Sequence, residues 1–344
     1  MSDALLLALP EAQLAAYLKT HVPDFLGPLR ATKFKTGQSN PTYLIEAASG
    51  RYVLRRKPPG KLLASAHAVD REFRVLGALA NSRVPVARPL HLCLDESIVG
   101  SVFYLMSYVP GRIYFDPSLP DLAPEVRTAH YSAVLDVLAA LAKLDVAALG
   151  LADYGKSGNY FARQVARWSE QYRAAETERI EPMEALLAWL PQAVPADDGR
   201  SALVHGDFRI DNLIWANATS NVAAIVDWEL STLGHPFSDI AYFCMALRLP
   251  RNPVLPGLAS VERAALGIPD ENAMLERFVA ATTLDPRPHW NFLLAFQFFR
   301  LAAIAQGVLK RALQGNASSE QALAAGRMAR TIAELGAASA GMPG

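Results

Sequence analysis

The sequence predicts an α+β fold, with extended segments in its first third and helices in most of the remainder. Two runs rich in β-branched and aromatic residues, 52–55 and 101–109, favour strands. The stretches 126–144 and 274–312 are rich in Ala and Leu and have the apolar spacing of helices. Pro110-Gly111 closes the second strand run, because proline cannot donate to a sheet and glycine lets the chain turn. We therefore predict a boundary near residue 108 between a sheet-containing part and a helical part.

Composition narrows the class of protein. The 344 residues are 51% hydrophobic, enough for one large or two moderate domains. Lys and Arg together number 33, as do Asp and Glu, and a nucleic-acid partner would normally show as a basic excess. The two cysteines, Cys93 and Cys244, lack the spacing of a zinc site or a disulfide framework. We therefore expect no nucleic-acid partner and two reduced thiols.

The apolar segments do not have the pattern of a targeting or membrane-spanning sequence. No Lys or Arg precedes the apolar patch at residues 4–9, which argues against a signal peptide. The most apolar segment, 292–309, is interrupted by Gln297, Arg300 and Gln306, which favours a buried helix over a membrane span. We expect a cytoplasmic protein with no membrane partner, and its oligomeric state is left open.

The most specific signal is the segment 205–212, which reads HGDFRIDN, together with Asp227 at the end of a later apolar run. Asn212 lies five residues after Asp207, and Asp227 lies twenty residues after Asp207. Phosphoryl transfer from a magnesium-bound nucleotide needs one base and two oxygen ligands, and this set supplies them. We predict that Asp207 accepts the proton of the attacking hydroxyl. Asn212 and Asp227 are predicted to hold Mg²⁺, which takes one or two carboxylates beside the substrate phosphates.

The residues around the motif fit the same chemistry. Arg209 can offer a rigid fork to phosphate oxygens, although a solvated surface charge is an equally open interpretation. The β-type runs 212–215 and 222–226, separated by turn-forming residues, predict a hairpin. Folding of this hairpin would bring Asn212 beside Asp227. The alternative is that His-Gly-Asp is an ordinary turn and Asp227 a helix cap.

The pattern His-Gly-Asp-x-x-x-x-Asn followed by Val-Asp-Trp-Glu resembles the aminoglycoside phosphotransferase and choline kinase family, and the resemblance covers nearly the whole chain. It implies a two-lobed protein-kinase-like fold. Residues 1–107 would form a small N-lobe of antiparallel sheet with one helix, and residues 108–344 a larger, mainly helical C-lobe. The resemblance also implies ATP in the cleft, Mg²⁺, and phosphorylation of a small-molecule hydroxyl. The small, Gly-rich end, 337–344, is predicted to be disordered.

The resemblance places further nucleotide contacts in the N-lobe. A polar turn lies where a nucleotide-covering hairpin is expected, although an ordinary hairpin turn would look the same. The residues of this turn are Gly37, Gln38, Ser39 and Asn40. The adenine edge would be read by backbone groups at the lobe boundary. These groups belong to Ser107, Tyr108 and Val109.

Arg55 stands where the family has its phosphate-binding lysine, and this is a departure because arginine is a permanently charged fork. Arg56 and Lys57 are alternative candidates for the same role. Glu72, on a helix with apolar residues at three- and four-residue spacing, is the expected partner of Arg55, with a solvated helix face as the alternative. Asp239 matches a family aspartate that braces the catalytic loop.

The acceptor is expected to be a small molecule, because no long activation segment follows Glu229. Aminoglycosides and choline are cations, whereas residues 288–316 are aromatic and apolar with Arg300, Lys310 and Arg311 among them. The stretches 52–60 and 299–307 resemble the branch of the family fused to acyl-CoA dehydrogenases. That resemblance implies phosphorylation of a hydroxyacyl-CoA thioester.

A basic cluster in the N-lobe would suit the phosphates of CoA, although a solvated strand edge plus the ATP site explains it equally well. Its members are Arg51, Arg55, Arg56, Lys57 and Lys61. Two alternatives stay open. One is a kinase for an aminoglycoside, choline or another small alcohol, and the other is a catalytically inactive, nucleotide-binding pseudokinase.

Overall fold

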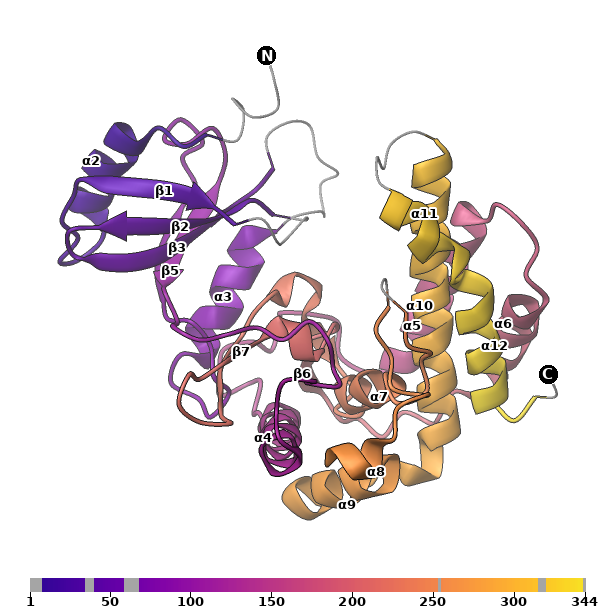
Figure 1. Ribbon diagram of the computed structural model, residues 1–344. Coiled ribbons are helices and arrows are strands. Elements are labelled where there is room, and N and C mark those ends of the chain that lie inside the picture. Colours follow the sequence, from indigo (N-terminus) through magenta and orange to yellow (C-terminus); the bar gives the residue numbers. More distant parts are fainter. Residues whose placement is uncertain (1–7, 35–39, 59–67, 253–254, 315–319, 343–344) are drawn as a thin grey trace. The chain divides into compact units, whose positions relative to one another are not determined.

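The computed structural model describes residues 8–34, 40–58, 68–252, 255–314 and 320–342, which fall into two compact units (Figure 1). Unit 1 comprises Met1–Arg112 and Leu213–Ser231, and unit 2 comprises Ile113–Asn212 and Thr232–Gly344. The units therefore differ from the predicted lobes, since the first division falls after Arg112 and residues 213–231 join the sheet-containing unit. Backbone hydrogen bonds account for this, because Arg112 and Trp215 bond reciprocally at 3.0 and 2.8 Å.

The main sheet of unit 1 is antiparallel, with five strands in the order β1-β2-β3-β5-β4. The strands are β1 (Leu29–Lys33), β2 (Thr42–Ala47), β3 (Gly50–Arg56), β4 (Pro89–Cys93) and β5 (Phe103–Ser107). Two helices accompany the sheet, α2 (Glu11–His21) and α3 (Val69–Leu79). The strands and the helix that the sequence predicted in this region are thus present.

The helices α2 and α3 cover opposite faces of this sheet. Leu14 and Leu18 of α2 share one buried cluster with Leu54 of β3. The side chain of Arg55 points to the opposite face, because successive strand residues alternate. There its Nε atom lies 3.0 Å from Glu72 Oε2 on α3. Because side chains alternate along β3, Leu54 packs on the side of α2 and Arg55 lies on the side of α3.

The hairpin predicted after the catalytic motif is confirmed. It consists of β7 (Leu213–Trp215) and β8 (Val222–Ile225), with Leu213 paired to Ile225. A 3-10 helix, Trp228–Leu230, follows and packs against α3. The close approach of Gly111 explains why a glycine stands there, since a Cβ atom at this position would overlap the carbonyl oxygen of Trp215.

Unit 2 is mainly helical. Its helices are α4 (Pro124–Ala142), α5 (Tyr160–Ala175), α6 (Glu181–Ala193), α7 (Ser238–Met245), α8 (Arg263–Leu266), α9 (Glu271–Thr282), α10 (Trp290–Leu313), α11 (Glu320–Arg327) and α12 (Ala329–Ser339), with 3-10 helices at Ile210–Asn212 and Arg287–His289. Two short strands, β6 (Ala202–Val204) and β9 (Thr232–Gly234), pair antiparallel. The long helix α10 is the centre of this unit and packs against α5, α6, α7, α11 and α12 (Figure 1).

The predicted helical stretch 274–312 is two helices rather than one. Thr283, directly after α9, adopts a left-handed conformation with φ of 62°. Pro286 and Pro288 follow it, and proline cannot continue the hydrogen bonding of a helix interior. By length and composition, Arg287–Leu313 could cross a membrane, but 83% of its most apolar window is buried within the structure, as in the core helix of a globular unit.

The C-terminal end also differs from its predicted disorder. Ala337–Ser339 is the last turn of α12, and both Ala337 and Ser339 are buried. Alanine is the strongest helix former, and Gly336 brings α12 close to Leu186 of α6 and Phe298 of α10. Packing of a small-residue face therefore orders a segment that composition alone assigns to a tail.

Candidate active site

The catalytic motif begins in a turn of unit 2 that is fixed from two sides. Gly206 has φ of 85°, a conformation that glycine adopts without strain. The backbone N–H groups of His205 and Gly206 donate to the carboxylate of Asp239, at 2.7 and 3.0 Å. Arg300 donates to the Gly206 carbonyl oxygen at 2.5 Å. Asp239 therefore has the bracing geometry that the sequence predicted, and α10 supplies a second brace.

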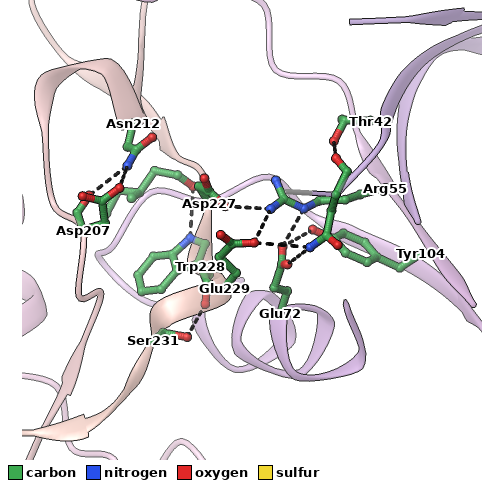
Figure 2. Close-up of polar contacts among 12 residues, drawn as sticks. Thr42, Arg55, Glu72, Tyr104, Asp207, Asn212, Asp227, Trp228, Glu229 and Ser231 are labelled. Carbon is green, nitrogen blue, oxygen red and sulfur yellow. Dashed lines mark hydrogen bonds and ion pairs between the residues drawn. The ribbon is translucent and has the colours of Figure 1, made fainter. Parts of the chain in front are cut away.

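Asp207, the predicted base, directly follows this turn. The Tyr242 hydroxyl donates to its Oδ1 atom at 2.7 Å, and Arg209 Nε lies 3.2 Å from the same atom. Asn212 Nδ2 donates to Oδ2 at 3.1 Å and to the Asp207 backbone carbonyl at 2.8 Å (Figure 2). The side chain remains 22% exposed, so the carboxylate is held in place and is still open to a substrate hydroxyl.

These neighbours also determine the charge of Asp207. Burial opposes its ionisation, but the positive charge of Arg209 and the hydrogen bond from Tyr242 outweigh burial and hold the pKa of the Asp207 carboxyl below its ordinary value. Burial, together with the nearby Asp207 charge, raises the pKa of Tyr242, so its hydroxyl stays protonated and donates. Asp207 is therefore a carboxylate at neutral pH.

Asp227, a predicted metal ligand, lies in unit 1 directly before the 3-10 helix Trp228–Leu230. Its backbone is left-handed, with φ of 66° and ψ of 58°, which is uncommon for a residue with a side chain and is best tolerated by Asn and Asp. Its Oδ1 atom lies 2.6 Å from Arg55 Nη2 (Figure 2). Such an outlier is typical of functional positions.

Arg55 is surrounded by three carboxylates, Glu72, Asp227 and Glu229, which we call the acidic cluster. Its guanidinium lies 3.0 Å from Glu72, 2.6 Å from Asp227 and 3.5 Å from Glu229. Asn40 Nδ2 donates to Glu72 at 3.1 Å and to Glu229 at 3.4 Å. The predicted Arg55–Glu72 ion pair is therefore present, and Asn40 joins two members of the cluster.

The charges of this cluster depend on one another. Burial lowers the pKa of Arg55, but Glu72, Tyr104 and Asp227 more than compensate and hold it above its usual range. Burial raises the pKa of Glu72 to about 7; Asp227 and Glu229 act in the same direction, against Arg55 and the Tyr104 hydroxyl that donates at 3.0 Å. One guanidinium thus faces three carboxylates, and burial makes Glu72 a weaker acid than an ordinary glutamic acid.

The prediction that Arg56 could replace Arg55 is wrong. Arg56 is 1% exposed, lies on the face of β3 opposite to Arg55, and donates to the Val99 carbonyl oxygen at 2.5 Å. Lys57 has its Nζ atom 3.8 Å from Asp70, at the surface. Arg55 and Arg56 therefore do not belong to one phosphate-binding patch, because strand alternation separates them.

The remaining predicted nucleotide contacts are only partly described. Gly37, Gln38 and Ser39 lie outside the described residues. Ser107 ends β5, where its backbone N–H donates to the Arg88 carbonyl oxygen at 2.8 Å. The Tyr108 ring lies 4.3 Å from the Arg51 guanidinium carbon. The Ser107 N–H is thus already bonded, and a nucleotide role for Ser107, Tyr108 and Val109 stays a prediction.

The predicted Mg²⁺ ligands have suitable chemistry. Within the described ranges, no group of three or more His, Cys, Asp or Glu side chains is arranged to hold a metal ion. Mg²⁺ does not require one, since it binds through one or two protein oxygens beside substrate phosphates and water. The Asn212 amide nitrogen is bonded to Asp207, which leaves its oxygen to act as a ligand. An Asn oxygen and an Asp carboxylate fit the ion, and their meeting stays a prediction.

Four residues of this geometry were not predicted as part of the site. They are Tyr104, Glu229, Tyr242 and Arg300. Tyr242 follows Asp239 by three residues on α7, so helical spacing could have identified it. Arg300 reaches the Gly206 carbonyl across 94 positions of sequence and carries no local signal.

The fold is that of a phosphotransferase. Residues 30–259 match the model of the phosphotransferase enzyme family, and the chain belongs to this family. It is 49% identical to acyl-CoA dehydrogenase family member 10 of Mus musculus over 334 residues, covering 96% of this chain and 31% of the mouse protein. It is 42% identical to family member 11 of Rattus norvegicus, covering 94% of this chain and 42% of the rat protein. The chain thus spans less than half the length of these curated relatives.

Solved structures agree. A Ralstonia eutropha protein provisionally described as an aminoglycoside phosphotransferase is 44% identical, with a TM-score of 0.89 over 97% of this chain and 99% of that chain. The aminoglycoside phosphotransferase APH(4)-Ia, in a complex with ADP and hygromycin B, superposes with a TM-score of 0.61 at 14% identity, over 94% of this chain and 97% of that chain, and shows the fold alone. The two-lobed kinase-like fold class predicted from the sequence is confirmed, and the chain is an enzyme of the kinase type.

Proposed function

We propose that the protein transfers the γ-phosphoryl group of ATP, with Mg²⁺, to a hydroxyl of a small molecule, and that this molecule is a hydroxyacyl-CoA. The observation that carries the reaction type is the setting of Asp207. Its carboxylate is held by Tyr242, Arg209 and Asn212, is kept ionised, and is 22% exposed. A fixed, accessible carboxylate is what a phosphotransferase needs beside the attacking hydroxyl.

In the proposed reaction the hydroxyl oxygen forms a bond to the γ-phosphorus while the bond to the β–γ bridging oxygen breaks. ADP leaves with the electron pair of that bond, and the hydroxyl proton passes to Asp207. Because the Asp207 pKa lies below its ordinary value, this carboxylate is a weak base. It orients the hydroxyl first and accepts the proton late, as a loose transition state allows.

The second requirement of the reaction is to neutralise the negative charge on the phosphates. Arg55 presents a guanidinium fork suited to paired phosphate oxygens, and Glu72 and Asn40 fix the position of that fork through the acidic cluster. Asn212 and Asp227 would hold Mg²⁺, which supplies charge neutralisation for the phosphate oxygens. Arg209, 43% exposed and paired to Asp207 and Asp211, would contact the transferred phosphate.

The acyl-CoA part of the proposal has support from the relatives. The curated relatives are named as acyl-CoA dehydrogenase family members, and this chain matches only part of each. A hydroxyacyl-CoA acceptor would give both parts of such a protein related substrates. The basic cluster predicted for the CoA phosphates no longer supports this assignment, because Arg55 and Arg56 point to opposite faces of the sheet and Lys57 lies beside Asp70. Lys61 lies outside the described residues.

The experiment is an acceptor panel. Purified protein is incubated with Mg-ATP and, separately, 3- and 4-hydroxyacyl-CoAs, aminoglycosides, choline, ethanolamine and sugars, and each acceptor is examined by mass spectrometry for one added phosphoryl group. A phosphorylated hydroxyacyl-CoA is the expected result, and the Asp207→Ala variant serves as the blank. Phosphate on an aminoglycoside or an amino alcohol alone would keep the kinase and remove the acyl-CoA acceptor.

The pseudokinase alternative has its own readout. An inactive nucleotide-binding protein would bind ATP and transfer phosphate to none of the acceptors. Calorimetry of ATP binding with and without Mg²⁺ separates this case from an active enzyme with an untested acceptor, because an active site should bind the Mg²⁺ complex more tightly than free ATP. Transfer of phosphate to any acceptor by the wild type, and its loss in Asp227→Ala, would exclude the pseudokinase.

A further inference from the structure

Unit 2 contains a pocket beside the catalytic loop. It is lined by residues of the loop, α4, α7, α9 and α10, and it is partly open to solvent. Small-molecule sites are concave and mostly apolar, with a few polar groups that fix the orientation of the ligand. This pocket is formed entirely within one unit.

The lining of the pocket is apolar at depth. Met245, Leu258 and Met274 are each at most 3% exposed. Among the described residues that line it, the charged side chains are Arg209 and Asp211, which pair with each other at 3.1 Å. An aminoglycoside would bring several positive charges and would need carboxylates free to meet them. An alkyl chain needs apolar walls, and flexible methionines adapt to its shape.

Two lining residues also contact the predicted base. Tyr242 donates to Asp207 at 2.7 Å, and Arg209 Nε lies 3.2 Å from the same oxygen. A ligand in the pocket would thus have one end next to the residues that hold Asp207. Phe115, which is 60% exposed, also lines the pocket and presents an aromatic surface to solvent.

We propose that this pocket binds the acyl chain of the acceptor and selects acceptors by chain length. The inference rests on the proposed function, because it takes the hydroxyl on the chain to be the group that Asp207 orients. The carbons beyond the hydroxyl lie against Met245, Leu258 and Met274, and the thioester end extends toward solvent. Selection follows from volume, since each buried methylene adds affinity until the pocket is full and a longer chain then overlaps the buried walls.

The experiment measures kcat/KM for 4-hydroxyacyl-CoAs of increasing chain length. For the wild type, kcat/KM should rise roughly fourfold per methylene, corresponding to the burial of one CH₂ group, and then fall beyond an optimum. Met274→Ala, which enlarges the pocket, should move the optimum to longer chains. Met245→Phe, which fills it, should move the optimum to shorter chains.

The matched control is Met183→Ala. Met183 on α6 is 0% exposed, as is Met274, but it does not line the pocket. Both alanine variants create a buried cavity and lose stability for the same reason. Only Met274→Ala should change the chain-length profile. A profile that is flat in the wild type, or that shifts equally in Met183→Ala, would overturn the proposal.

A binding measurement keeps this result separate from the proposed function. Calorimetry with acyl-pantetheines that lack the hydroxyl reports the pocket without phosphoryl transfer. If hydroxyacyl-CoAs are phosphorylated but neither the rate profile nor the binding profile responds to Met274→Ala, the pocket assignment fails and the function stands. If binding follows chain length and responds to Met274→Ala while no hydroxyacyl-CoA gains phosphate, the pocket stands and the acceptor assignment fails.

Discussion

Arg55 Nη2 lies 2.6 Å from Asp227 Oδ1, so the guanidinium assigned to the nucleotide phosphates is paired with the carboxylate assigned to Mg²⁺ (Figure 2). In the proposed reaction the phosphates of a metal nucleotide would bind Arg55 and its cation would bind Asp227, so each partner of this pair would exchange one counter-charge for another. With these proposed roles, the pair would couple the binding of metal to that of phosphate, and arginine suits the position because its fork serves Glu72 and Asp227 together.

Arg55→Lys should therefore raise the KM for ATP by about ten- to a hundredfold, corresponding to the loss of hydrogen bonds to charged groups, while leaving measurable turnover. A lysine is a point charge and cannot bridge Glu72 and Asp227 as the fork does. Steady-state kinetics with varied ATP checks this. Arg30→Lys, the same change at an exposed position of β1, is the control. An unchanged KM would show that Arg55 serves the fold and not the nucleotide.

Asp207→Ala should lower kcat by roughly 10² to 10⁴ while ATP binding is retained, as expected for loss of a base. Tyr242→Phe should have a smaller effect in the same direction, because it removes one hydrogen bond to Asp207 and leaves the carboxylate in place. Single-turnover rates and calorimetry separate the two quantities. Asp136→Ala, on the exposed part of α4, is the control. Weaker ATP binding in proportion to the loss of rate would contradict the assigned role.

The pH dependence of kcat/KM should be set by Glu72 and not by Asp207. Burial raises the pKa of Glu72 to about 7, whereas the pKa of Asp207 is held below its ordinary value. As the pH falls through about 7, Glu72 gains a proton and its ion pair with Arg55 is lost, so kcat/KM for ATP should fall. Glu72→Gln should have a low rate without this inflection. An inflection that persists in Glu72→Gln would assign it to another group.

Protonation of Glu72 should have opposite effects on activity and on stability: it lowers kcat/KM, and it stabilises the folded protein. In the folded protein the pKa of Glu72 is about 7, above its ordinary pKa of 4.5, which it has in the unfolded chain. Its stabilising contribution is complete below the unfolded pKa and is lost as the pH rises through about 7. Thermal unfolding should therefore show that Glu72→Gln loses less stability than the wild type between these two pH values.

The extent to which sequence determines this site differs from residue to residue. Asp207, Asn212 and Asp227 could be predicted as site residues because their spacing within one motif and one hairpin is local, and the β7–β8 hairpin has the predicted strands. The Arg55–Glu72 pair followed from aligning one strand and one helix with a family. In contrast, the choice between Arg55 and Arg56 depends on which face of β3 each occupies, and only the packing of α2 against Leu54 reveals it.

Contacts between distant segments were beyond prediction. Arg300 on α10 holds the Gly206 carbonyl oxygen, and the pocket joins residues of the catalytic loop to α9. Neither has a periodic signal, because the partners meet only after the helices of unit 2 pack. Pro286 and Pro288 do mark the break between α9 and α10 in the sequence. The break was overlooked because the apolar periodicity continues on both sides of these prolines.

Asp239→Asn should loosen the turn that positions Asp207 while unit 2 stays folded. The carboxylate accepts from His205 N and Gly206 N through its two oxygens, whereas an amide has one acceptor and would face the other N–H with its own donors. An unsatisfied buried donor costs about 1–3 kcal/mol. We expect a lower Tm, a lower kcat and a KM for ATP close to that of the wild type.

Hydrogen exchange at His205 and Gly206 gives the readout that distinguishes positioning from general destabilisation. Exchange should rise at these two amides more than in β9, which pairs with the neighbouring strand β6. Asp270→Asn is the matched control, because Asp270 is the N-cap of α9, accepts from Ala273 N, and Asn caps helices equally well. If kcat fell only in proportion to unfolded protein, with no selective rise in exchange, Asp239 would contribute to the core of unit 2 and not to the position of Asp207.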